Sequence, residues 1–206
     1  MNKKRIRKVR YAVVGLGHIA QVAVLPAFAK ARNSDLVALI SGDSKKRSKL
    51  GKLYHVDRLY SYDQYEECLM QDVDAVYVGL PNHLHRDFTV RALQAGVHVL
   101  CEKPMAASSD ECREMIQAAK ENKRKLMIAY RLHFEKANLE AIETARSGKL
   151  GDLRFFSSVF AQQVVAGNIR LTESIERGGG PVWDMGVYCI NAARYPLRGF
   201  GAWLGD

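Results

Sequence analysis

The sequence predicts an α/β protein with a Rossmann-type, doubly wound parallel sheet, followed by the start of an incomplete α+β domain. Apolar runs alternate with helical stretches up to about residue 129, as in parallel strands joined by helical crossovers. A glycine-rich turn follows the first apolar run, and the alternation stops near Tyr130. We therefore expect a dinucleotide-binding domain at residues 1–129 and a partial substrate and dimerisation domain at 130–206.

The first domain is expected to hold five strands with a helix after each of the first four. The strands are predicted at Val9–Val14, Leu36–Ile40, Asp74–Gly79, Val97–Leu100 and Lys125–Ala129. The helices are predicted at Ile19–Ala31, Lys45–Leu53, Leu84–Ala95 and from Ser108 to about Glu121. Ser108 and Glu111 have the spacing of a capping box, which marks the start of the last of these helices.

The second domain begins with an amphipathic helix at Glu135–Ser147 and an alternating, antiparallel-type strand at Leu153–Phe160. Pro181 opens a further helix, Val182–Tyr195, because proline suits the first helical position. One strand can neither cover its edges nor bury its own face. We therefore expect this domain to be incomplete.

The glycine turn has the form Gly15-x-Gly17-x-x-Ala20 and lies between the first strand and the first helix. This order suits a dinucleotide pyrophosphate, since Gly15 permits the tight turn and Gly17 permits close backbone approach. Ala20 keeps the helix near the sheet, and the helix N-terminus offers N–H groups to an anion. Gly15, Gly17, His18 and Ile19 are therefore predicted to bind the cofactor.

The residue that ends the second strand faces the adenosine ribose in this fold and is often a carboxylate when NAD is bound. Here it is Ser41, 21 residues after Ala20, and Lys46 and Arg47 follow. A hydroxyl beside cations favours the 2′-phosphate of NADP, so NAD is the less favoured cofactor. Two alternatives stay open: Asp43 as the ribose carboxylate, and Lys45–Arg47 as an ordinary solvated helix face.

Glu102-Lys103-Pro104 lies where another parallel strand should end, at the sheet edge that binds substrates. Hydride transfer from an alcohol needs a group that takes the hydroxyl proton. Lys103 can take it when its amine is neutral, which partial burial favours. Glu102 could orient the ribose or the lysine, and the alternative is a surface lysine before a proline.

Polar side chains also follow the third long strand, at Asn82, His83 and His85. Asn82 is suited to bond the nicotinamide ribose or carboxamide. His85 is either a cofactor-binding residue or an ordinary first-turn residue. No third ligand accompanies the histidine pair, so we predict no metal site.

Asp184 and Tyr188 have i, i+4 spacing in the last predicted helix and should share one face. A carboxylate and a phenol that face one cleft can bind a polyol and relay a proton. With Lys103 they form the predicted catalytic set. The alternative is a capping aspartate and a packed tyrosine.

The composition restricts the classes of partner and location. The net charge of +9 falls to +3 when six basic residues of the first ten are set aside, and these are Lys3, Lys4, Arg5, Arg7, Lys8 and Arg10. We predict a solvated, partly disordered arm and no nucleic-acid partner. Since no apolar run approaches about eighteen residues and no signal peptide is evident, we predict a cytoplasmic protein without membrane contact. The four cysteines show no zinc spacing and are expected to be reduced.

These motifs together resemble the glucose–fructose oxidoreductase/inositol dehydrogenase/rhizopine catabolism (Gfo/Idh/MocA) family, and the glucose–fructose oxidoreductase branch most of all. The resemblance runs from the glycine turn through Glu102-Lys103-Pro104 to Gly178-Gly-Gly-Pro-Val-Trp-Asp-Met-Gly-Val-Tyr188. It implies Lys103 as the catalytic lysine, Asp184 and Tyr188 as substrate and relay residues, and Ser41 and Lys46 on the NADP 2′-phosphate. Tyr130-Arg131 fits the same branch, and Arg131 is taken as cofactor-binding.

The resemblance implies an NADP-dependent oxidoreductase that transfers hydride to or from a sugar or related polyol. Family chains run beyond residue 206, so we expect a truncated chain whose full-length form is a homo-oligomer. The alternative is a catalytically impaired, dinucleotide-binding remnant of such an enzyme.

Overall fold

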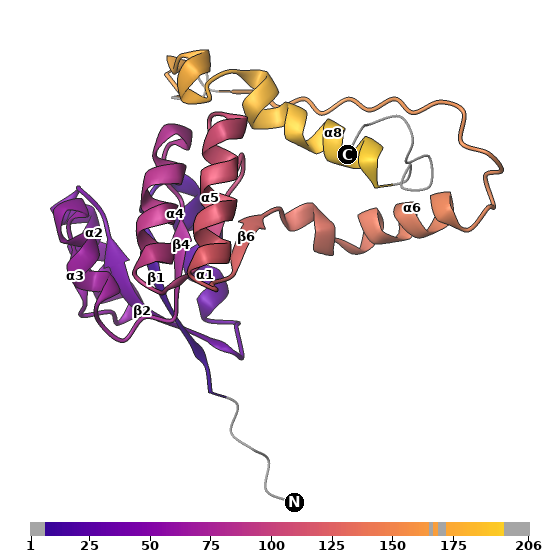
Figure 1. Ribbon diagram of the computed structural model, residues 1–206. Helices are drawn as coiled ribbons and strands as arrows, with labels where there is room; N and C mark the ends of the chain where they lie inside the picture. Colours follow the sequence, from indigo (N-terminus) through magenta and orange to yellow (C-terminus); the bar gives the residue numbers. More distant parts are fainter. Residues whose placement is uncertain (1–6, 165–166, 169–171, 196–206) are drawn as a thin grey trace, which may run out of the picture. The chain divides into compact units, whose positions relative to one another are not determined.

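The computed structural model describes residues 7–164, 167–168 and 172–195. The chain divides into two compact units, Met1–Ala129 and Tyr130–Asp206, and each is described by itself (Figure 1).

The first unit is built on a six-stranded parallel sheet. Its strands are β1 (Val9–Val14), β2 (Ser34–Ile40), β3 (Leu59–Tyr60), β4 (Ala75–Val78), β5 (His98–Glu102) and β6 (Leu126–Ala129). Their order is β3-β2-β1-β4-β5-β6, with every neighbouring pair parallel. The chain therefore runs outward from β1 in one direction and then from β4 in the other, and the order reverses between β1 and β4. Ligands bind at such a reversal, beyond the carboxyl ends of the strands.

Helices cover both faces of this sheet. They are the π-helical segment η1 (Ala20–Val24), α1 (Leu25–Phe28), α2 (Ser44–Tyr54), the 3₁₀ turn η2 (Tyr62–Gln64), α3 (Tyr65–Leu69), the 3₁₀ turn η3 (Asn82–Leu84), α4 (His85–Gln94) and α5 (Ser109–Glu121). Residues of α3, α4 and α5 pack with Val14 and Val78 on one face, whereas residues of η1, α1 and α2 pack with Val13 and Tyr77 on the other. Figure 1 shows α4 and α5 side by side over the sheet.

The doubly wound fold predicted from the sequence is confirmed, and β1 has the predicted bounds. The prediction missed β3 and α3, because a two-residue strand and a five-residue helix are too short to show a period. The predicted helix Ile19–Ala31 ends instead at Phe28, and its residues Ala20–Val24 are π-helical.

The predicted capping box at the start of α5 forms only in part. The Ser108 hydroxyl accepts the backbone N–H of Glu111 at 3.2 Å, as expected for an N-cap. The Glu111 carboxylate instead accepts from the backbone N–H of Ala107, at 2.9 Å, one residue before the N-cap.

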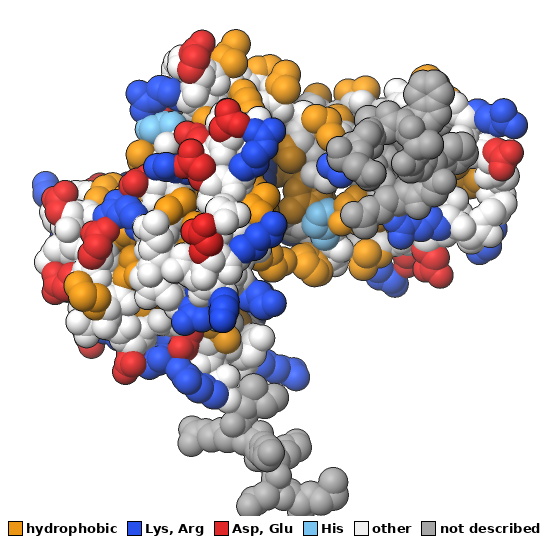
Figure 2. All heavy atoms as spheres, in the orientation of Figure 1, with side chains coloured by type: hydrophobic (Ala, Val, Ile, Leu, Met, Phe, Trp, Pro, Cys, Tyr) orange, Lys and Arg blue, Asp and Glu red, His pale blue; other side chains and the backbone are white. Residues whose placement is uncertain are grey.

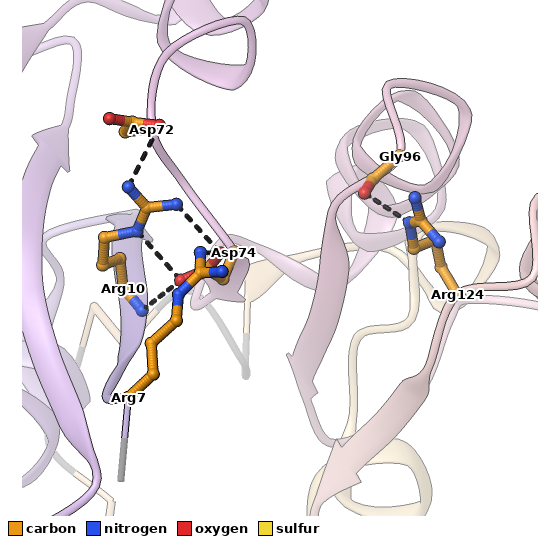
Figure 3. A network of polar contacts seen from close by, with 6 residues as sticks. All are labelled: Arg7, Arg10, Asp72, Asp74, Gly96 and Arg124. Carbon is orange, nitrogen blue, oxygen red and sulfur yellow. Dashed lines mark hydrogen bonds and ion pairs between the residues drawn. The ribbon is translucent and has the colours of Figure 1, made fainter. Parts of the chain in front are cut away.

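Arg7, Lys8 and Arg10, the described basic residues of the predicted arm, pair with acids, and the Arg7 side chain is still 73% exposed (Figure 3). Asp74 accepts from Arg7 at 2.7 Å and from the Arg10 guanidinium at 3.0 Å, while Asp72 lies 3.0 Å from Arg10. Lys8 pairs with Asp35, and Lys3, Lys4 and Arg5 lie outside the described residues. The Arg10 hydrogen bond lowers the pKa of Asp74 to about 2.

Figure 3 also shows the Arg124 guanidinium donating to the backbone carbonyl of Gly96. This contact ties the segment before β6 to the turn after α4. The Arg124 contact and the pairing of Asp74 with Arg7 and Arg10 together fix the edge of the sheet opposite to the carboxyl ends of its strands.

The second unit is largely helical where it is described. It contains the 3₁₀ turn η4 (Arg131–Phe134), α6 (Lys136–Arg146), the 3₁₀ turn η5 (Ile175–Arg177), the π-helical segment η6 (Val182–Gly186) and α8 (Val187–Arg194). The predicted strand at Leu153–Phe160 is wrong, because no described segment pairs with these residues to form a ladder. None of the helices in the described ranges is long and apolar enough to cross a membrane.

Candidate functional site

The glycine turn joins the carboxyl end of β1 to η1. Gly15 has φ of +90° and donates its N–H to the Ile40 carbonyl of β2 at 3.1 Å. A Cβ on Gly15 would overlap the backbone carbonyl of Gly79, which follows β4. Only glycine therefore lets this turn approach the β4 loop without strain.

The next residues of the turn present backbone at the surface. Gly17, His18 and Ile19 are exposed, while Ala20, the first residue of η1, is fully buried. A Cβ on Gly17 would meet no described atom within 4 Å. Packing within the chain therefore does not require glycine here, whereas close approach of a phosphate group to this backbone does. These residues thus fit a dinucleotide pyrophosphate.

Ser41 directly follows β2 and is nearly buried, at 4% exposure. Its hydroxyl accepts the backbone N–H of Asp43 at 3.2 Å, and its carbonyl accepts from the Arg47 guanidinium. These two hydrogen bonds hold the carboxyl end of β2, and they place the Arg47 guanidinium beside Ser41.

Asp43 is the N-cap of α2. Its carboxylate accepts the backbone N–H of Lys46 at 2.9 Å and lies 3.7 Å from the Lys46 amine. The backbone hydrogen bond from Lys46 lowers the pKa of the Asp43 carboxyl. Asp43 and Lys46 therefore lie together beside the strand end, and Asp43 has a structural role there.

The predicted catalytic lysine lies at the carboxyl end of β5. Lys103 is buried, at 8% exposure, and precedes Pro104 through a cis peptide bond. Its backbone N–H donates to one carboxylate oxygen of Glu102 at 3.1 Å. The second oxygen of Glu102 accepts from the Tyr77 hydroxyl at 2.8 Å.

Tyr77 is a site residue that the sequence reasoning missed. It lies within β4 at 2% exposure, and burial together with the Glu102 charge raises the pKa of its phenol. The hydroxyl is therefore protonated and donates to Glu102. The available signal was a polar atom in an otherwise apolar buried strand, since such an atom needs a hydrogen-bond partner.

Asn82 and His85 lie beyond β4, at the same edge of the sheet. Asn82 begins η3 and is partly exposed. His85 is fully buried, with Nδ1 2.8 Å from the Pro104 carbonyl and Nε2 2.9 Å from the Leu80 carbonyl. Burial lowers the pKa of this imidazole. Its ring thus lies inside the domain, between two loops that follow neighbouring strands.

The remaining predicted residues belong to the second unit. Asp184 is buried in η6 at 8% exposure, and Tyr188 follows in α8. The Tyr188 ring stacks on Phe160 with centroids 4.6 Å apart, and its backbone carbonyl accepts from the Tyr130 hydroxyl at 3.5 Å. Arg131 has an 80% exposed side chain and pairs with Glu135.

Tyr188 also lines a cavity of about 250 Å³ within this unit, together with Tyr130, His133, Phe160 and Tyr195. The cavity is bordered by both α6 and α8. The structure thus places a partly exposed phenol in a mostly apolar hollow of the second unit.

No group of three His, Cys, Asp or Glu side chains within the described ranges could hold a metal ion. All four cysteines are free. Burial raises the pKa of the Cys101 thiol, beside Glu102, to about 12, so it is no activated nucleophile.

Two family models match the chain. A model described as an oxidoreductase family with an NAD-binding Rossmann fold (Gfo/Idh/MocA) matches residues 9–130, which is more than half of the chain. The chain belongs to this family. A model of the Gfo/Idh/MocA C-terminal domain matches residues 138–200.

Several relatives are similar over most of this chain. An uncharacterized oxidoreductase from Rhizobium meliloti is 33% identical over 187 residues, which are 90% of this chain and 55% of that protein. A D-xylose 1-dehydrogenase [NADP(+)] from Haloarcula marismortui is 29% identical over 92% of this chain and 54% of its own length. This Gfo/Idh/MocA chain thus spans just over half the length of the curated relatives it matches.

Two solved structures are also similar. An aldose-aldose oxidoreductase from Caulobacter crescentus, complexed with glycerol, superposes with a TM-score of 0.82 at 40% identity, covering 93% of this chain and 58% of that one. A 3-ketoreductase from Actinomadura kijaniata, in complex with NADP and TDP-benzene, superposes with a TM-score of 0.83 at 30% identity and the same two coverages.

Proposed function

We propose that this chain carries the cofactor-binding and catalytic residues of an NADP-dependent oxidoreductase acting on a sugar or related polyol. The observation that supports this most is the buried Lys103, held by Glu102 at the sheet edge that also carries the glycine turn. Relatives named for NADP and for sugars support the same class of reaction.

Lys103 is the proposed proton-transfer group. When bound, the nicotinamide cofactor accepts or supplies the hydride. Lys103 takes the proton of the substrate hydroxyl in oxidation and returns it in reduction, which is general acid–base catalysis. Glu102 fixes the backbone of Lys103, and the Tyr77 hydroxyl fixes Glu102. Asp184 and Tyr188 are proposed to bind the sugar and to relay the proton.

The cofactor contacts are proposed for the carboxyl edge of the sheet. Gly15, Gly17, His18 and Ile19 would hold the pyrophosphate. Gly17, His18 and Ile19 are exposed, whereas Gly15 is buried and forms the tight turn that precedes them. Asn82, Glu102, Lys103 and Arg131 are proposed as further cofactor-binding residues. His85, the other residue predicted for this role, is fully buried with both ring nitrogens at backbone carbonyls, and we do not propose it as a direct cofactor contact.

NADP is preferred over NAD because cationic groups lie beside the end of β2. Arg47 donates to the Ser41 carbonyl, and the Lys46 amine is 39% exposed in the first turn of α2. The Asp43 carboxylate, the alternative ribose ligand, already accepts from the Lys46 backbone. Because the Asp43 side chain is 50% exposed, it stays accessible to a ribose, and the affinity measurements below distinguish the two cofactors.

Affinity measurements test the cofactor assignment. NADPH should bind more tightly than NADH, and Lys46→Ala should weaken NADPH binding by about ten- to a hundredfold, as loss of a charge-assisted contact does. The matched control is Lys45→Ala, which removes an exposed neighbouring cation. Equal affinities of the wild type for NADPH and NADH would overturn the assignment.

Turnover tests the catalytic assignment. In a protein of the relatives' length, Lys103→Ala should reduce sugar oxidation by roughly 10²–10⁴-fold while leaving NADPH affinity nearly unchanged. Tyr188→Phe should slow turnover less, because water can partly replace a relay. A Lys103→Ala enzyme within a few-fold of wild type would remove the lysine from the proposal. NADPH binding without turnover of any sugar would favour a dinucleotide-binding remnant.

The proposed partner is therefore a small sugar or polyol, and a homo-oligomer is proposed for the full-length form. Figure 2 shows Lys and Arg interspersed with Asp and Glu over the visible face, and this mixture supports the prediction that nucleic acid is not a partner. The cytoplasmic location stays a prediction of the sequence.

A further inference from the structure

The ring of His85 connects two loops of the first unit. Nδ1 lies 2.8 Å from the carbonyl oxygen of Pro104, in the turn after β5, and Nε2 lies 2.9 Å from that of Leu80, in the loop after β4. The side chain is fully buried. A buried polar ring between two backbone groups fixes the separation of those groups.

Both neighbours are carbonyl oxygens, which only accept hydrogen bonds. A neutral imidazole carries one N–H and can donate to one carbonyl only. Burial lowers the pKa of His85, which favours the neutral ring. The position of its one proton therefore decides which loop the side chain holds.

The contact of His85 with the Pro104 carbonyl lies next to the proposed proton-transfer group, Lys103. Pro104 follows Lys103, whose backbone N–H donates to Glu102 at 3.1 Å. Lys103 is buried, at 8% exposure, so most of the residue is covered by other groups of the chain. A carbonyl held one residue later therefore fixes the backbone from which the lysine side chain extends.

We propose that His85 is a positioning residue for Lys103, which it holds by donating from Nδ1 to the Pro104 carbonyl. This inference rests on the proposed function for its catalytic meaning, whereas the contact itself can be tested without turnover. It differs from the predicted direct contact of His85 with the cofactor, because both ring nitrogens point to backbone carbonyls.

Two amide variants separate the two ring nitrogens. In His85→Asn, the side-chain NH₂ can take the place of Nδ1 and still donate to Pro104. In His85→Gln, the longer side chain places its NH₂ near Nε2, so that it can donate to Leu80 instead. Both variants replace the same buried ring with an amide, and each is therefore the control for the other.

Hydrogen exchange of the Lys103 amide is the main measurement, with the β4 amide of Val76 as the internal reference. His85→Gln should speed Lys103 exchange about tenfold relative to wild type, and His85→Asn should leave it within about threefold. Equal acceleration in the two variants, or faster exchange in His85→Asn, would overturn the proposal. A purely structural role would change Lys103 and Val76 alike in both variants.

Nitrogen-15 NMR of the wild-type histidine ring gives a test that needs no variant. A proton on Nδ1 supports the proposal, and a ring protonated on Nε2 alone overturns it. Where a sugar is turned over, kcat should fall about tenfold in His85→Gln but not in His85→Asn, with NADPH affinity retained in both. Absence of any turnover would count against the proposed function, while exchange and NMR would still decide the role of His85.

Discussion

The two units of this chain differ in how much apolar surface each can bury. In the first unit, helices on both faces of the sheet bury residues of β1, β2, β4 and β5. In the second, α6 and α8 contain no buried residue, and Phe155, Val159 and Val182 are 71–89% exposed. The unit that carries the glycine turn and Lys103 is thus a self-sufficient scaffold, whereas the second has apolar surface that needs a covering partner.

Hydrogen exchange should show the largest difference between the units. Strand amides of β1 and β4 should be protected up to the global unfolding free energy, roughly 5–15 kcal/mol. The segment 153–160 has no ladder and should exchange with almost no protection. Limited proteolysis should accordingly cut beyond Ala129 before it cuts the sheet.

The same exposed surface predicts self-association of the isolated chain, which sedimentation at several protein concentrations would measure. NADPH should protect the first unit further by mass action. A monodisperse monomer with protease resistance throughout 130–206 would contradict this contrast between the two units.

A matched pair of leucine substitutions gives the next largest effect. Leu93 of α4 is fully buried, so Leu93→Ala should lower the free energy of unfolding by about 2–5 kcal/mol. Leu139 of α6 is 50% exposed, and Leu139→Ala should change it by roughly 0.5 kcal/mol or less. Thermal or urea unfolding would measure both, and similar losses would show that α6 is packed as well as α4.

The same contrast explains what could be predicted from the sequence. In the first unit, hydrophobic period and glycine placement determine the structure locally, so β1 and the capping role of Ser108 were predictable. The position of the site at one edge of the sheet was also predictable, because parallel strands bring their carboxyl ends together at that edge. The strand predicted at Leu153–Phe160 failed because a strand requires a partner, and alternation alone does not supply one.

Contacts between distant residues were the other part that sequence reasoning could not reach. Tyr77 bonds Glu102, 25 residues away, and His85 bonds the carbonyl of Pro104, 19 residues away. No sequence motif marks either pair, because these contacts depend on strand register and on the path of the turn after β5. The residues of the glycine turn were found from their spacing, whereas the groups supporting Lys103 required the fold.

The smallest predicted effect compares one ion pair from each unit. Asp74 bonds Arg10 in a contact where both side chains are less than a third exposed, whereas Lys136 and Glu140 pair at 91% and 62% exposure. Asp74→Asn should lower stability at neutral pH by about 1–2 kcal/mol, and Glu140→Gln by a few tenths at most.

The pH dependence of unfolding isolates the Asp74 contribution. Because the folded-state pKa of Asp74 is about 2, below its ordinary value near 4, the unfolded chain binds a proton first as pH falls. The stability that Asp74 supplies is therefore complete above about pH 5 and is lost between about pH 4 and pH 2. In that range, the unfolding free energy of Asp74→Asn should fall less steeply than that of the wild type, and Glu140→Gln should follow the wild type. Equal slopes for Asp74→Asn and wild type would mean that solvent screens this pair as fully as the one on α6, so that the two units would not differ in their ion pairs.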